Sequence, residues 1–81
     1  QIKLFPNPSS EDVKIQFNAS EQMNAQLEVR SISGKVEISQ SVEITGGVQT
    51  LSIETSQLKA GYYIISINNE KLNKALRFVK I

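Results

Sequence analysis

The stretch LKAGYYIISI, residues 58–67, decides the fold of this chain of 81 residues. Tyr63, Ile65 and Ile67 share one parity, and Tyr62 and Ile64 share the other. A period of two is the pattern of a β-strand with one buried face. The preceding Lys-Ala-Gly predicts a turn, because glycine adopts backbone angles that other residues avoid. We therefore predict a turn followed by a strand, with Tyr63 on the buried face.

The same alternation recurs outward from this strand in both directions. Turn signals rich in Gly, Pro, Asn and Ser separate the apolar runs at intervals of about 8–12 residues, as in sandwiches. The predicted strands cover residues 2–5, 12–17, 25–31, 35–44, 48–54, 62–68 and 74–80, and a break near Ser39–Ser41 stays open. No long window carries the apolar repeat of a helix. We predict an all-β, immunoglobulin-like β-sandwich of about seven antiparallel strands.

Three features of the sequence carry more specific expectations. Ser33-Gly34-Lys35 predicts a tight hairpin in which Gly34 has a positive φ. Tyr63 resembles the tyrosine of immunoglobulin-like sandwiches that opens the penultimate strand and bonds through its hydroxyl to upstream backbone. Tyr62 and Ile64 lie on the opposite parity, so we expect them either to be partly exposed or to pack against a neighbour outside this domain.

The composition excludes several classes of site. The chain has no cysteine and no histidine, which removes disulfides, Cys/His zinc sites and His-based catalytic triads. A net charge of +1 argues against a nucleic-acid partner. The length suits one domain over residues 1–81. Because the chain begins at Gln1 and not at Met, we expect it to be excised from a larger secreted protein.

Catalytic chemistry finds little support in the sequence. The acids lie near turns or on the polar parity of strands, where a solvated face is the ordinary interpretation. The serines form no G-x-S-x-G elbow, and no phosphate or calcium loop is present. We therefore predict no enzyme, no metal and no cofactor. A sugar-binding platform needs exposed aromatic rings, and Tyr62 and Phe5 are the candidates off the core parity.

The last dozen residues carry four cations against one acid, Glu70. The cations are Lys71, Lys74, Arg77 and Lys80. One interpretation is an edge strand protected by charge. The other is a basic face that docks a partner, for instance by strand addition. Both interpretations stay open from the residues alone.

Three spaced motifs and a final strand resemble one known family. They are LFPNPSS at residues 4–10, VRSISGKV at 29–36, LKAGYYII at 58–65 and the apolar-basic strand at 75–81. In this order and spacing they resemble the C-terminal sorting domain of the type IX secretion system of the Bacteroidota (type A, Por secretion system family). The sequence departs from the usual pattern at Phe5, where Tyr is frequent, and at Tyr62, where Val or Ile is frequent.

The resemblance implies a folded sorting signal, which is a substrate of the export process rather than a catalyst. The parent protein would cross the inner membrane by a signal peptide. The outer-membrane translocation machinery would then recognise this domain in the periplasm. A surface sortase of cysteine-protease type would cut it from the upstream cargo domain, which would be secreted or held at the cell surface.

The resemblance also implies a sorting motif. It consists of Pro6, Asn7, Pro8, Gly34, Leu58, Gly61, Tyr63, Lys74, Arg77, Phe78, Val79 and Lys80. We expect Gly34 and Gly61 to be structural turns first, and the basic face of the last strand to be the best candidate for contact with the machinery. The alternatives are an immunoglobulin- or fibronectin-like spacer and a carbohydrate-binding module of a cell-surface protein.

Overall fold

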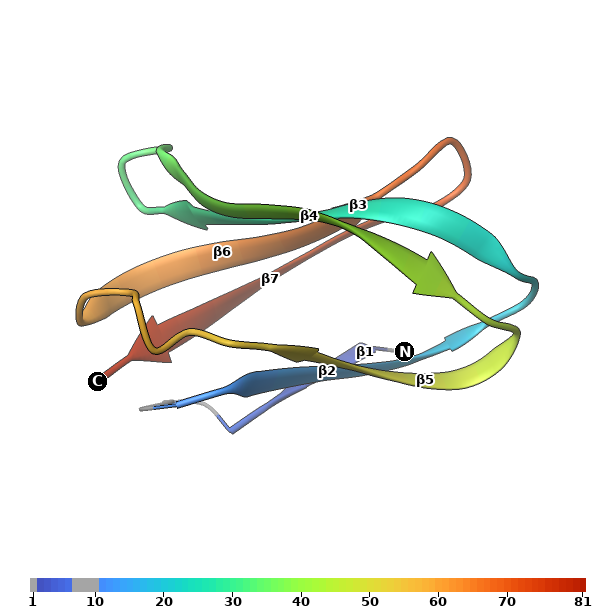
Figure 1. Cartoon of the computed structure of the whole chain (residues 1–81), viewed down its shortest axis with the longest axis horizontal. Coiled ribbons are helices and arrows are strands. Elements are labelled where there is room, and N and C mark those ends of the chain that lie inside the picture. The colour runs from blue at the N-terminus through green and yellow to red at the C-terminus, as the bar shows by residue number, and fades with distance from the viewer. Residues whose placement is uncertain (1, 7–10) are drawn as a thin grey trace.

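The structure is a computed structural model that describes residues 2–6 and 11–81, and its described residues form an all-β sandwich (Figure 1). Each of the predicted strands is present. Their bounds are β1 Ile2–Phe5, β2 Val13–Ala19, β3 Met23–Ser31, β4 Val36–Ile44, β5 Gly47–Ile53, β6 Gly61–Asn68 and β7 Asn73–Lys80. The described part of the chain holds no helix that is long and apolar enough to cross a membrane.

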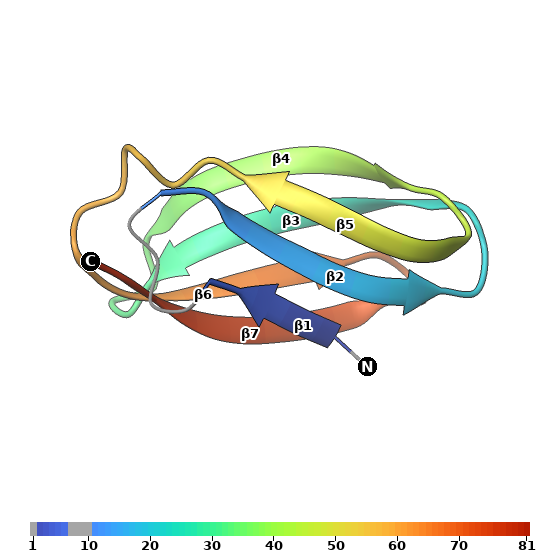
Figure 2. The same ribbon diagram turned by 90° about the horizontal axis from the view of Figure 1, so that it is seen from below.

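The strands form two antiparallel sheets that pack face to face (Figures 1 and 2). One sheet has the order β1-β2-β5 and the other the order β4-β3-β6-β7. The hairpins β3–β4 and β6–β7 stay within one sheet, whereas the connections β2–β3, β4–β5 and β5–β6 pass from one sheet to the other. This arrangement is consistent with the expected immunoglobulin-like sandwich.

The core lies between the sheets and is built by the side chains of one parity on each strand. Val13, Ile15 and Phe17 point inward from β2, and Ile65 and Ile67 point inward from β6. Burying one such side chain contributes about 1.5–3 kcal/mol of transfer free energy. The alternation in the sequence therefore identified the inner face of these strands correctly.

Strand β4 differs from its expectation in one respect. It runs without a break through Ser39–Ser41, and the irregularity is a register shift nearer the hairpin. Val29 pairs with Ile38, but the next residue, Arg30, pairs with Val36. An extra residue in one strand reverses the facing of the residues beyond it. Val36 therefore lies on the outer face, 39% exposed, although it has the same parity as Ile38, which packs against the core.

The β3–β4 hairpin confirms the expectation for Gly34. The Gly34 amide donates to the Ser31 carbonyl at 2.8 Å, and the Ser31 amide donates to the Lys35 carbonyl at 2.9 Å. Gly34 has a φ of 98°. This is the three-residue hairpin loop that ends in a left-handed residue, a position that glycine occupies without steric cost.

The loops divide between two ends of the sandwich (Figure 2). The β3–β4 hairpin, the β5–β6 loop and the C-terminus lie at one end, which we call the C-terminal end. The connections β2–β3, β4–β5 and β6–β7 lie at the other, which we call the far end. The chain enters β1 toward the far end, near the label N.

Candidate functional site

Most of the predicted sorting motif gathers at the C-terminal end. Gly34 forms the hairpin there, residues 58–63 form the loop and the start of β6, and β7 ends there. Antiparallel pairing brings the last two groups together, since Gly61 is paired with Lys80 and Tyr63 with Phe78. Pro6 follows β1 at the same end. Asn7 and Pro8 lie outside the described residues.

Tyr63 forms the corner that its position predicts. It is buried, and its hydroxyl donates to the Lys59 carbonyl at 2.6 Å. Its ring stacks on Phe78, with centroids 5.4 Å apart and an interplanar angle of 21°. Gly61, with a φ of 154°, turns the chain into β6. Tyr63 therefore fixes the loop that precedes β6 to the strand itself.

Lys80, at the end of β7, bonds to the same β5–β6 loop that Tyr63 contacts from β6. Its side chain is only 5% exposed, and its ammonium donates to the Thr55 carbonyl at 2.7 Å and to the Leu58 carbonyl at 3.3 Å. The Thr55 hydroxyl in turn donates to the Glu11 carbonyl. The end of β7, the β5–β6 loop and the entry to β2 are thus joined. Nothing in the local pattern around Thr55 indicated this role.

The expected basic face of β7 is wrong. Lys80 and Lys74 share the parity of the buried Phe78, whereas Arg77 has the opposite parity and lies on the outer face. Lys71 lies in the far-end turn. The cations of β7 lie on two different faces because successive side chains of a strand point to opposite sides of the sheet. Of the four, Lys80 is bonded to backbone carbonyls and is not available to a partner.

The exposed aromatic rings do not form a platform. Tyr62 is 66% exposed on the outer face of the four-stranded sheet, and Ile64 beside it is partly buried. The expectation of partial exposure is therefore confirmed for both. Phe5 is also exposed, but it pairs with Lys14 on the outer face of the other sheet. The two rings therefore face away from each other.

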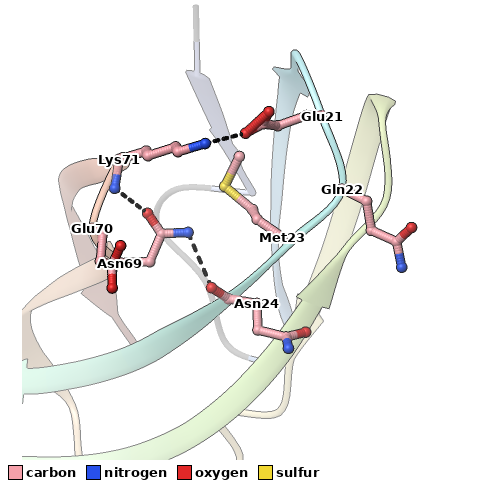
Figure 3. A pocket seen from close by; sticks show the side chains of 7 residues that line it. All are labelled: Glu21, Gln22, Met23, Asn24, Asn69, Glu70 and Lys71. Carbon is pink, nitrogen blue, oxygen red and sulfur yellow. Dashed lines mark hydrogen bonds and ion pairs between the residues drawn. The ribbon is translucent and has the colours of Figure 1, made fainter.

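The far end carries a shallow polar pocket between the β2–β3 loop and the β6–β7 turn (Figure 3). The Asn69 side chain accepts hydrogen bonds from the Lys71 amide at 2.7 Å and the Leu72 amide at 2.6 Å, and donates to the Asn24 carbonyl at 3.0 Å. Lys71 also pairs with Glu21 at 2.8 Å.

The ion pair at the far end shifts both of its partners. The Lys71 ammonium holds the pKa of Glu21 below its ordinary value, through a hydrogen bond and charge attraction. Glu21 raises the pKa of Lys71 for the same two reasons. Exposed pairs contribute little to stability. We interpret this pocket as a structural contact that holds the β2–β3 loop against the β6–β7 turn, because its polar groups bond to one another.

The structure offers no ready metal site in its described part, where no group of three or more Asp or Glu side chains could hold an ion. Against known proteins, the family model described as the secretion system C-terminal sorting domain matches residues 3–81. That range includes every residue of the predicted sorting motif. No curated protein and no solved structure matches the chain.

Proposed function

We propose that this chain, which belongs to the family of secretion system C-terminal sorting domains, is recognised in the periplasm as a folded domain and later cut from its cargo. The family is the C-terminal sorting signal of type IX secretion. The chain therefore directs a cargo carried by the same polypeptide to the cell surface or the medium. Recognition by the outer-membrane translocation machinery and removal by a surface sortase are the finer steps of the proposal.

One observation carries the proposal of folded recognition. Gly34, the stretch 58–63 and the end of β7 are far apart in the sequence, and they meet only when the sandwich has formed. The Tyr63 hydroxyl fixes the stretch 58–63 to itself through the Lys59 carbonyl, and the Lys80 ammonium joins the end of β7 to this stretch through the Leu58 carbonyl. A receptor that reads these motifs as one surface needs the folded domain.

Cleavage upstream of β1 is compatible with this surface. The chain enters the sandwich toward the far end (Figure 2), and β1 is an edge strand of its sheet. A sortase acting on the preceding linker would work away from the C-terminal end. The domain could then be cut off while its C-terminal end stays bound to the machinery.

The alternatives are less well supported. A generic spacer does not account for the family match over residues 3–81. A carbohydrate-binding module needs aromatic rings on one surface, but Tyr62 and Phe5 lie on the outer faces of opposite sheets. The family is a sorting signal and is not known as an enzyme, so we propose that the domain is a substrate of the export process.

The proposal is tested by fusing this domain and a short linker to the C-terminus of a periplasm-targeted fluorescent protein in a type IX-competent host. We expect reporter at the surface or in the medium, trimmed of the domain. Leu27→Asp places a charge at a fully buried position outside every motif. Since a buried unpaired charge unfolds a small domain, we expect this variant to stay in the periplasm.

Gln26→Asp, at an exposed position of the same strand, is the matched control and should be exported like the parent. Export of an unfolded Leu27→Asp variant at the parental level would show that the motifs are read as linear sequence. Periplasmic retention of the parent fusion beside an exported reference domain would refute the proposed function itself.

A further inference from the structure

The outer face of the four-stranded sheet is divided into two unlike halves. Toward the far end its outward side chains are polar or small, in cross-strand rows that strand pairing defines. One row is Ser39, Glu28, Ser66 and Ala75, and the next is Ser41, Gln26, Asn68 and Asn73. Such rows are what a solvated sheet face requires.

Toward the C-terminal end the composition of the same face changes. The next row is Val36, Arg30, Ile64 and Arg77, and beyond it Tyr62 is paired with Val79. Ile32, in the hairpin turn, is 74% exposed and lines the same shallow hollow as Tyr62 and Val79. We call Ile32, Val36, Tyr62, Ile64, Arg77 and Val79 the outer patch.

The two arginines in this half of the outer face differ in their partners, and Arg77 belongs to the outer patch whereas Arg30 does not. The Arg30 guanidinium lies 2.9 Å from the Glu28 carboxylate and also donates to the Gly34 carbonyl. The Arg77 guanidinium is exposed, and no described residue accepts a hydrogen bond from it or pairs with it. The patch is therefore an apolar surface with one unpaired cation beside Ile64.

We infer that the outer patch is the surface by which the sorting domain docks on a protein of the translocation machinery, and that this protein presents apolar side chains beside a carboxylate for Arg77. The inference rests on the proposed function and adds the surface and the chemistry of the partner. Exposed apolar patches with a polar rim mark interaction sites. Tyr and Arg are also the side chains that most often dominate binding energy.

Two other occupants fit the charge less well. A second copy with two-fold symmetry would place the same patch on both sides and bring two unpaired Arg77 groups into one interface, where like charges repel. An anionic membrane surface attracts clusters of about 4–8 cations, whereas this patch carries one unpaired cation. A carboxylate-bearing protein satisfies Arg77 and covers the apolar rows together.

The test uses the same fusion, with the folding of each variant checked by circular dichroism and urea unfolding of the purified domain. Arg77→Glu reverses the unpaired charge of the patch, and Lys14→Glu makes the same change at an exposed position of β2 that lies outside both the patch and the sorting motif. Ile32→Ser and Val48→Ser form a second pair, because the two side chains are 74% and 72% exposed. We expect both patch variants to lower export about tenfold or more, as loss of an interface hot spot does, and both controls to stay near the parental level.

Parental export of folded Arg77→Glu and Ile32→Ser would overturn the inference and leave the proposed function intact, because the parent fusion is exported in the same assay. Ile32→Ser changes an exposed turn, so the test stands even if Arg77→Glu unfolds. A photocrosslinker at Tyr62 should label a translocation protein, whereas one at Val48 should not. Labelling of lipid or of a second copy alone would also overturn the inference.

Discussion

At the scale of single residues, the burial of Lys80 is the feature with the clearest energetic consequence. A buried ammonium loses its hydration and is tolerated when hydrogen bonds replace it. Here the Thr55 and Leu58 carbonyls supply those bonds. The carbonyls depend on the ammonium in turn, since a buried acceptor without a donor carries its own desolvation cost.

We therefore expect Lys80→Met to destabilise the domain by about 1–3 kcal/mol, the usual cost of leaving a buried polar group unsatisfied. The methionine retains most of the side-chain volume, so packing changes little. Urea unfolding of the purified domain measures the effect. Lys74→Met, at an exposed position of the same strand, should stay within about 0.5 kcal/mol of the parent. Equal stabilities of the two variants would show that the ammonium contributes nothing.

At the scale of elements, the β3–β4 hairpin depends on the backbone of Gly34 more than on its surroundings. A Cβ added to Gly34 meets no atom within 4 Å, but its φ of 98° is one that L-residues rarely adopt. The cost of a substitution there is thus conformational and not steric. The outer patch begins at this hairpin, with Ile32 in the turn and Val36 after it.

We expect Gly34→Ala to lower the free energy of unfolding by about 1–2 kcal/mol, the penalty of a left-handed conformation for a residue with a Cβ. Gly46→Ala provides the control, because Gly46 has no positive φ and its added Cβ meets only a backbone atom at 4.0 Å. Thermal unfolding followed by circular dichroism compares the two. A loss at Gly46 as large as that at Gly34 would contradict the explanation.

The elements themselves were largely predictable, for a physical reason. Alternation within a strand is local, and it predicted the strands and the inward faces of Ile15 and Ile65. The bulge that turns Val36 outward depends on pairing with β3. The burial of Lys80 depends on carbonyls 22 and 25 residues away. The sequence around Val36 does not show how β4 pairs with β3, and the sequence around Lys80 does not show which carbonyls accept its hydrogen bonds.

The candidate site was likewise predictable only where its residues depend on local sequence or on the family resemblance. The motif residues could be named from the family resemblance, and Tyr63 from its place at the start of the penultimate strand. The outer patch could not be predicted, because Val36, Ile64 and Arg77 fall in one row only through the strand order β4-β3-β6-β7. Strand order is a property of the whole fold, and periodicity gives no information on it.

At the scale of the whole molecule, the two sheets share one core. The chain passes from one sheet to the other three times, at β2–β3, β4–β5 and β5–β6. Neither sheet has a second apolar layer of its own to pack against within the described residues. A sheet of three or four strands that loses its packing partner exposes its inner face to water. The sandwich should therefore unfold as one unit, as small single domains usually do.

We expect urea unfolding followed by tyrosine fluorescence and by far-ultraviolet circular dichroism to give coincident transitions. Both tyrosines lie on β6 and report the four-stranded sheet, whereas circular dichroism reports every strand. Ile15→Ala changes the other sheet at a fully buried position and should cost about 2–5 kcal/mol, moving both transitions together. If Ile15→Ala lowered the urea midpoint measured by circular dichroism but left the midpoint measured by tyrosine fluorescence unchanged, the two sheets would unfold separately. Cooperative unfolding would instead make the motif-bearing end sensitive to damage anywhere in the core, so that only intact domains would present the surface that we propose the machinery recognises.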